Sequence, residues 1–217
     1  KAECPFRVSG ITEGEGCIRF RMDLIPEELE LRVPGGHNVL NAAASVALLH
    51  SLVEKKTGSF GPVEAEVCAT GIRAFRGSRR RSQIVGERDG ILFVDDYGHH
   101  PTEIKATLAG YKEFYPGRRI VLDFMPHLYS RTSDFFNDFI SAFDDADILL
   151  MHKIYSSARE TEGKVSGSDL YDAVRARRAN VHYFREVMDA RDFCTFLLRT
   201  GDVFITMGAG DNWRLGA

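Results

Sequence analysis

The second half of the chain alternates between helix-like and strand-like segments, and this alternation limits the fold more than any other feature. The pattern predicts helices at 101–115, 132–143, 168–177 and 189–199, and strands at 118–124, 146–152, 181–184 and 202–207. Strands that alternate with helices form a mainly parallel sheet with helices on both faces. Two more strands are expected in "RSQIVGERDGILFVDDY", joined at Asp89-Gly90, the strongest hairpin signal in the chain. We therefore predict an α/β fold.

The first half has a different pattern. Residues 1 to about 33 contain alternating runs such as "CIRFRMDL" and "LELRV", which predict a small antiparallel meander with one buried face. Two helices are expected next, in "HNVLNAAASVALLHSLVEKKTG" and "GPVEAEVCATGIRAFRG". We place a domain boundary near Gly77, which divides the chain into residues 1–77 and 78–217.

Composition and charge narrow the class of protein. The formal net charge of -3 over 217 residues argues against a general nucleic-acid-binding surface. The four cysteines form no Cys-x-x-Cys pair, as expected of buried thiols in the cytoplasm; they are Cys4, Cys17, Cys68 and Cys194. The most apolar window is shorter than the about 18 residues of a membrane span. Because the chain starts with Lys1 and opens on strand-like sequence, we expect a fragment.

Polar clusters follow three of the predicted strands. They are "DDYGHHP" at 95–101, "MPHLYSRTSD" at 125–134 and "MGAGDN" at 207–212. In open α/β sheets, ligands bind beyond the carboxyl ends of the strands. We therefore expect the three clusters to share one edge of the sheet and to form a site there. The alternative is that turns after strands are polar without a function.

The first candidate residues lie at the start of the first long helix. His37, Asn38 and Asn41 stand where a helix offers unpaired amide donors, and an asparagine amide can match the edge of a base such as adenine. The alternative is that Asn38 is only the N-cap. A second candidate is the run "GSRRRSQ", whose guanidinium groups could bind phosphate oxygens or simply be solvated.

The strand-end clusters supply the remaining candidates. Asp95 or Asp96 can accept hydrogen bonds from ribose hydroxyls, and His99 can exchange protons near neutral pH. Pro101 is expected to begin a helix whose N-terminus favours anions, although a His or Asp here could also serve only as a cap. Arg131 suits a carboxylate, unless it pairs with a nearby acid. Adjacent histidines lack the spacing of helical zinc ligands, and "MGAGDN" lacks a full dinucleotide-binding pattern.

Five segments together occur in the order and spacing of the Mur ligases. They are "HNVLNAAA", "GSRRRSQ", "DDYGHHPTEIKATL", "PHLYSRTSDFFNDF" and "GDVFITMGAGD". The chain resembles this family over essentially its whole length, most closely the members that add L-alanine, the first amino acid in peptidoglycan synthesis. The resemblance implies a cytoplasmic enzyme in which ATP phosphorylates the carboxylate of UDP-N-acetylmuramate. The amino group of L-alanine then attacks the acyl phosphate, with magnesium assistance.

The resemblance also implies a domain plan. Residues 1–77 would be the C-terminal part of a central P-loop-type ATP-binding domain, with a small antiparallel sheet. Residues 78–217 would be a C-terminal Rossmann-like lid domain that binds the amino acid. The chain contains no G-x-x-x-x-G-K-[ST] sequence, so the phosphate cradle and the magnesium ligands would lie in the missing part. The chain alone is therefore expected to be inactive.

Individual roles follow from the resemblance. It assigns to ATP the residues His37, Asn38 and Asn41 at the adenine, Arg81 at the phosphates and Asp96 at the ribose. It assigns to the acyl substrate and the amino acid the residues Tyr97, His99, His127 and Arg131, with His99 as the catalytic residue. No residue of this chain is assigned to a metal.

The chain departs from the usual family pattern at several positions. Leu128 stands where an arginine is usual, Met125 where a glutamine is usual and Ser82 where an aromatic residue is usual. The usual loop "YPAGE" is "YSSARE" here. Two alternatives to an L-alanine-adding ligase stay open. One is a sibling ligase with another amino acid or peptide specificity. The other is a stand-alone nucleotide-binding or interaction module.

Overall fold

The computed structural model describes residues 6–14, 16–156, 160 and 163–217, and it divides the chain into two compact units. Unit 1 extends to Gly77 and includes Glu113–Pro116. Unit 2 comprises Ser78–Lys112 and Gly117–Ala217. No helix in the described part is both long enough and apolar enough to cross a membrane.

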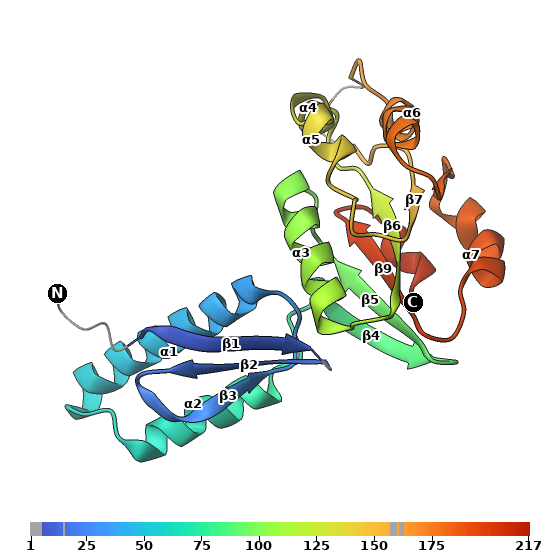
Figure 1. The fold of residues 1–217 in the computed structure, drawn as a ribbon. Coiled ribbons are helices and arrows are strands. Elements are labelled where there is room, and N and C mark those ends of the chain that lie inside the picture. The colour runs from blue at the N-terminus through green and yellow to red at the C-terminus, as the bar shows by residue number, and fades with distance from the viewer. Residues whose placement is uncertain (1–5, 15, 157–159, 161–162) are drawn as a thin grey trace. The chain divides into compact units, whose positions relative to one another are not determined.

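Unit 1 is a three-stranded antiparallel sheet with two helices (Figure 1). Its elements are β1 (Val8–Gly14), β2 (Cys17–Met22), β3 (Ile25–Leu31), α1 (Gly36–Thr57) and α2 (Pro62–Ala74). The alternation seen in the sequence is the alternation of burial, because Ile18 and Phe20 on β2 are buried and Arg19 between them is exposed. The predicted meander and both helices are confirmed.

Both helices of unit 1 carry a second apolar stripe that faces solvent. On α1, the side chains of Leu40, Leu48 and Leu52 are 64%, 64% and 56% exposed. On α2, Val63 and Val67 are 69% and 61% exposed. The opposite stripe of each helix is buried against the sheet, as at Val39 and Ala69. A helix that is apolar on opposite sides is typical of one packed between two layers.

Unit 2 is a six-stranded sheet in the order β4-β5-β9-β6-β7-β8. Its strands are β4 (Gln83–Arg88), β5 (Ile91–Asp96), β6 (Arg119–Met125), β7 (Ile148–Met151), β8 (Val181–Tyr183) and β9 (Asp202–Gly208). Only the pair β4 and β5 is antiparallel, which confirms the mostly parallel sheet. Asp89 and Gly90 both have positive φ, 54° and 75°, as a two-residue type I′ hairpin requires.

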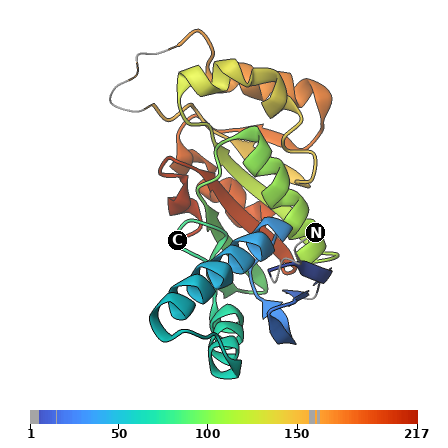
Figure 2. The same ribbon diagram turned by 90° about the vertical axis from the view of Figure 1, so that its left-hand side faces the viewer.

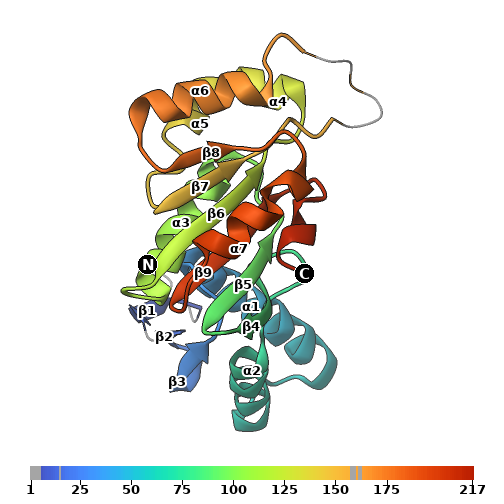
Figure 3. The same cartoon turned by 90° about the vertical axis from the view of Figure 1, so that its right-hand side faces the viewer.

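Helices cover both faces of this sheet. They are α3 (Pro101–Phe114), α4 (Tyr129–Asp134), α5 (Phe136–Ile140), α6 (Gly167–Arg177) and α7 (Arg191–Leu197), with 3-10 helices η1 (Val187–Ala190) and η2 (Asn212–Leu215). Figure 2 looks onto the face covered by α3, and Figure 3 looks onto the face covered by α7. Phe124 packs against Phe139 and Phe143, whereas Phe204 packs among residues of η1 and α7. The α/β fold is confirmed.

Two predicted helices are wrong in their extent. The helix expected at 132–143 is two short helices, α4 and α5, which begin three residues earlier and are interrupted at Phe135 (φ -109°, ψ 22°). The ring of Phe135 packs against His100, 4.5 Å between centroids, so a tertiary contact fixes the break. The helix expected at 189–199 is the 3-10 helix η1 followed by α7, which ends at Leu197. The described cysteines are buried and free, and Cys4 lies outside the described residues.

Candidate active site

The carboxyl ends of four strands of unit 2 meet at one edge of the sheet, which we call the rim. The register pairs Asp96 of β5 with Met207 of β9, and Met125 of β6 with Gly208. It also pairs Phe124 of β6 with Met151 of β7. The turns after β5, β6 and β9 therefore start side by side, as the sequence predicted.

Arg80 joins two of these turns directly. Its Nε donates to Asp95 Oδ2 at 3.0 Å, and its Nη2 donates to the carbonyl oxygens of Gly208 at 2.8 Å and Gly210 at 3.3 Å. The guanidinium also lies over the ring of Tyr97, 5.2 Å from its centroid. Residues from β5 and from the loop after β9 are thus held by one side chain, which the sequence analysis did not single out from its neighbours.

A row of rings joins the turn after β5 to the turn after β6. The ring centroids of Tyr97 and His99 are 5.2 Å apart, and those of His99 and His127 are 5.8 Å apart, both edge to face. Arg131 Nη1 lies 3.2 Å from His127 Nδ1. Four residues expected at the acyl and amino acid side are therefore neighbours in space: Tyr97, His99, His127 and Arg131. Arg80 connects the third turn, after β9, to Tyr97. The prediction that the three clusters share one edge of the sheet is confirmed.

The two histidines differ in their surroundings. His99 Nδ1 lies 2.8 Å from the carbonyl oxygen of Tyr97, and because a carbonyl only accepts, Nδ1 carries the proton. In the neutral ring Nε2 is then an acceptor, as a base requires. Burial, together with the charges of Arg131 and His99, lowers the pKa of His127. His127 is therefore neutral at pH 7 and accepts the hydrogen bond from Arg131.

The guanidinium of Arg131 contacts His127. Among the described residues, no carboxylate forms an ion pair with its guanidinium, whose Nη1 approaches only the ring and the carbonyl oxygen of His127. The alternative that Arg131 pairs with a nearby acid is therefore not seen in this part of the chain. A guanidinium that no described carboxylate neutralises, next to a neutral histidine, is suited to binding a carboxylate from a ligand.

Asp96 is buried and holds the local backbone. Its Oδ2 accepts hydrogen bonds from Ser82 N at 2.6 Å and Ser82 Oγ at 3.2 Å, and its Oδ1 accepts from Gly98 N at 2.7 Å. Burial raises the pKa of Asp96, against these three bonds and the charge of Arg81. Ser82, at a positive φ of 47°, is part of this arrangement, and such unusual backbone often marks a functional site.

Arg81 is held more loosely. Its Nη1 lies 3.8 Å from Glu103 Oε1, its guanidinium lies 5.7 Å from the centroid of Tyr97, and its side chain is 58% exposed. Exposed ion pairs of this kind contribute little to stability. The guanidinium is therefore accessible to a ligand phosphate without a large loss of internal contacts.

The start of α3 is filled by a side chain of the protein. Pro101 is its first residue, as predicted. Glu103 Oε2 accepts hydrogen bonds from the backbone N–H groups of His99 at 3.0 Å and His100 at 3.1 Å. Burial opposes ionisation, but these bonds outweigh it, and the pKa of Glu103 is lowered. The anion that this N-terminus was expected to favour is thus Glu103 itself.

A fourth strand end, after β7, also contributes, and the sequence analysis missed it. Leu128 N donates to Tyr155 O at 3.1 Å, and Tyr155 N donates to Pro126 O at 2.8 Å. Glu160 accepts from the backbone N–H groups of Tyr129 at 2.8 Å and Ser130 at 2.9 Å. These bonds explain why α4 begins at Tyr129. The sequence feature that could have revealed this strand end is the polar segment "YSSARE", which follows β7. Its residues 157–159 lie outside the described part.

In unit 1, the first turns of α1 carry His37, Asn38 and Asn41, as predicted. The N-cap is Gly35, at a φ of 92°, so the expectation that Asn38 could be the N-cap is wrong. Asn38 Nδ2 instead donates to Pro34 O at 2.8 Å, and Asn41 Nδ2 donates to Asn38 Oδ1 at 3.3 Å. The two amides are therefore oriented by each other and by the backbone.

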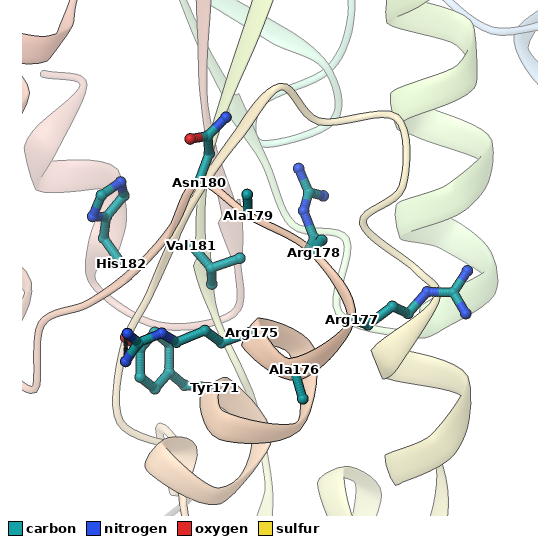
Figure 4. A pocket seen from close by; sticks show the side chains of 9 residues that line it. All are labelled: Tyr171, Arg175, Ala176, Arg177, Arg178, Ala179, Asn180, Val181 and His182. Carbon is teal, nitrogen blue, oxygen red and sulfur yellow. Dashed lines mark hydrogen bonds between the residues drawn. The ribbon is translucent and has the colours of Figure 1, made fainter.

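A pocket at the C-terminal end of α6 and the start of β8 lies at the opposite edge of the sheet (Figure 4). Its arginines have internal partners. Arg178 donates to the carbonyl oxygens of Phe143 and Ala146, and Arg177 Nη2 lies 2.9 Å from Asp144 Oδ2. None of the residues expected from the sequence to form a site lines this pocket, and the rim remains the candidate active site.

Comparison with known proteins identifies the family of the chain. Residues 80–210 match the family model described as "Mur ligase, glutamate ligase domain". The chain belongs to the Mur ligase family. It is 46% identical over 200 residues to the UDP-N-acetylmuramate--L-alanine ligase of Treponema pallidum (strain Nichols), covering 92% of this chain and 42% of that protein. The enzyme of the same name from Oleidesulfovibrio alaskensis is 44% identical over 214 residues, covering 97% and 45%.

Solved structures of Mur ligases share the fold. The crystal structure of the UDP-N-acetylmuramate-alanine ligase of Thermotoga maritima superposes with a TM-score of 0.74 at 24% identity, over 96% of this chain and 43% of that one. MurF from Thermotoga maritima, in complex with ADP, gives 0.64 at 14% identity, over 96% and 43%. This Mur ligase chain thus spans less than half the length of these relatives.

Proposed function

We propose that the chain is part of an ATP-dependent ligase that joins L-alanine to UDP-N-acetylmuramate through an acyl phosphate. The observation that carries the proposal is the identity of 44–46% to proteins named UDP-N-acetylmuramate--L-alanine ligase over nearly the whole chain. The row from Tyr97 to Arg131 supports it, because it supplies a base and a carboxylate-binding group side by side. The reaction would take place in the cytoplasm.

We propose that unit 1 is the C-terminal part of a central ATP-binding domain and that unit 2 is the Rossmann-like lid domain that binds the amino acid. The exposed apolar stripes of α1 and α2 support the first assignment, since a complete domain would cover them. The strand-end site of unit 2 supports the second. No ligation is expected from this chain by itself.

On the amino acid side, Arg131 would bind the carboxylate of L-alanine. His99 Nε2 would take the proton that the amino group loses as its nitrogen attacks the acyl carbon. The carbon–nitrogen bond forms, the bond from the acyl carbon to the phosphate oxygen breaks, and phosphate leaves. Tyr97 and His127 would orient His99, since the rings of both pack against its ring.

Leu128 marks a difference in the carboxylate site. With leucine where the family usually has arginine, one guanidinium is missing, and carboxylate binding would weaken by about 1.5–3 kcal/mol unless another donor replaces it. Leu128 has a φ of 68°, an unfavourable value for a leucine, so the backbone here is held by its surroundings. The amino acid that this ligase prefers therefore has to be measured.

For ATP, we propose that His37, Asn38 and Asn41 contact the adenine, that Arg81 contacts the phosphates and that Asp96 contacts the ribose. Asp96 would share its carboxylate between the ribose and the bonds to Ser82 and Gly98. Among the described residues, no group of three or more His, Cys, Asp or Glu side chains is placed to hold a metal ion. No step is therefore assigned to magnesium through this chain.

The test is a substrate panel on the full-length parent protein. Phosphate release would be measured with UDP-N-acetylmuramate, ATP and each of L-alanine, L-serine, glycine and a peptide. The proposal predicts the highest kcat/KM with L-alanine. Preference for serine, glycine or a peptide would show a sibling ligase, and a parent gene without a P-loop upstream would instead favour a stand-alone nucleotide-binding module.

A further inference from the structure

A buried polar network lies behind the rim and includes none of the residues assigned above. Asp123, His152 and Asn212 are all 0% exposed. His152 Nε2 lies 2.6 Å from Asp123 Oδ1, and Asn212 Nδ2 donates to Asp123 Oδ2 at 2.9 Å. Burying polar groups costs free energy even when they are well paired. A network of this kind therefore calls for an explanation.

The network connects the ends of three strands. Asp123 is on β6, His152 follows β7 directly, and Asn212 begins η2 after the glycine loop that follows β9. Asn212 Nδ2 also donates to the carbonyl oxygens of Met207 and Asp123, each at 3.1 Å. His152 Nδ1 donates to Phe184 O at 2.8 Å, in the turn after β8. One central carboxylate thus links the ends of β6, β7 and β9, from which three of the rim turns leave the sheet.

The hydrogen bonds determine the protonation of the network. Phe184 O only accepts, so His152 Nδ1 carries a proton, and with Asp123 ionised Nε2 carries the other. Burial disfavours the imidazolium, but the charge and hydrogen bond of Asp123 outweigh it, and the pKa of His152 is raised. The charge of Asp211 acts in the same direction. Glu186 interacts with the charge of His152, and the thiol of Cys194 interacts with Asp123; burial raises the pKa of Cys194 to about 12.

Stability alone does not explain this choice of side chains. Apolar side chains of similar size would fill the same space without desolvating a carboxylate and an imidazolium, often with no loss of stability. Apolar side chains make no directional contacts. Hydrogen bonds do, and they set the relative position of strand ends more narrowly than packing does. The turn that carries His127 and Arg131 directly follows β6, the strand on which Asp123 lies.

We propose that Asp123, His152 and Asn212 are positioning residues for the amino acid: their network holds the turn with His127 and Arg131 against the loop after β9. This inference rests on the proposed function, in which Arg131 binds the amino acid carboxylate. It predicts that loosening the network impairs amino acid binding without touching ATP binding. None of the three residues need contact a substrate.

The test uses steady-state kinetics of the full-length parent with three variants. Asp123→Leu removes the central acceptor, and Asn212→Leu removes only the bonds to Asp123 and Met207. Asp123→Asn is the conservative variant, since its amide can donate to a neutral His152 Nε2 and accept from Asn212, so that the geometry survives without the charges. Both leucine variants should raise the KM for the amino acid about tenfold and change the KM for ATP less than about twofold. Asp123→Asn should keep both constants near the wild-type values.

The matched control is Asp202→Asn, at the opposite edge of the same sheet. Asp202 is 1% exposed and pairs with Arg119 at 2.6 Å, so its loss also destabilises unit 2, but it is remote from the rim. A raised amino acid KM in Asn212→Leu together with a normal one in Asp202→Asn supports the positioning role. Unchanged amino acid KM in Asn212→Leu, or an equal increase in Asp202→Asn, overturns it.

The possible outcomes distinguish a failure of the inference from a failure of the proposed function. If Asp123→Leu does not fold, Asn212→Leu decides, because it removes fewer bonds. If the wild-type parent forms no amide bond with any amino acid, the proposed function fails, and the positioning role fails with it. An active wild type whose leucine variants keep the amino acid KM shows instead that only the positioning role is wrong.

Discussion

Replacing Arg80 by alanine should destabilise unit 2 strongly, because this side chain joins the turn after β5 to the loop after β9. It makes one charge-assisted bond to Asp95, whose side chain is 8% exposed, and bonds to two carbonyl oxygens of the glycine loop. Breaking a buried ion pair by removing one partner costs about 3–5 kcal/mol. Since Arg80 itself is 24% exposed, water compensates in part, and we expect a loss of about 2–4 kcal/mol.

The assay is urea unfolding followed by the fluorescence of Trp213, the single tryptophan, which lies on η2 in unit 2. The control is Arg88→Ala, because the side chain of Arg88 is 87% exposed and its ion pair with Asp89 spans 3.7 Å. Exposed pairs of this kind contribute at most about 1 kcal/mol, so the control should unfold near the wild-type midpoint. If Arg80→Ala unfolds at the same midpoint as Arg88→Ala, the reasoning that Arg80 holds the rim together is wrong.

Three further results are expected. In the full-length parent, Asp96→Ala should raise mainly the KM for ATP and Arg131→Ala mainly that for the amino acid; steady-state kinetics that show equal effects on both substrates would reject the two assignments. Leu48→Glu/Leu52→Glu should weaken self-association of this chain, since the exposed stripe of α1 is apolar, and sedimentation of the wild type as a pure monomer at the same concentration would contradict this. The lowered pKa of Glu103 means that its contribution is present above its unfolded value of about 4.5 and is lost as the pH falls through the folded value. Glu103→Gln should therefore flatten the acid limb of a stability-pH curve, and an unchanged acid limb would show that this carboxylate does not contribute.

The sequence predicted the parts of the fold that depend on periodicity. Alternating burial along β2 and continuous apolar runs such as β7 follow from the number of covered faces, so both sheets could be recognised from residue type alone. The Asp89-Gly90 turn needs positive φ at both positions, and few residue pairs provide it. The rim followed from topology, because parallel strands place their carboxyl ends together.

The features that the sequence did not reveal depend on partners from distant segments. The start of α4 is set by Glu160, and the break after it by the contact of Phe135 with His100. The pairing of Asp123 with His152 was equally hidden, since each residue stands in an apolar segment that reads as an ordinary strand. Residue type showed which groups could do chemistry, but not which of them would meet.

The most direct test of the shared rim is the distance between the rings of His99 and His127, which belong to turns after different strands. Their centroids lie 5.8 Å apart, edge to face, so a nuclear Overhauser spectrum of the selectively histidine-labelled protein should show cross-peaks between their ring protons. Assigned spectra in which both rings are visible and no such cross-peak occurs would contradict the convergence on which the proposed active site depends.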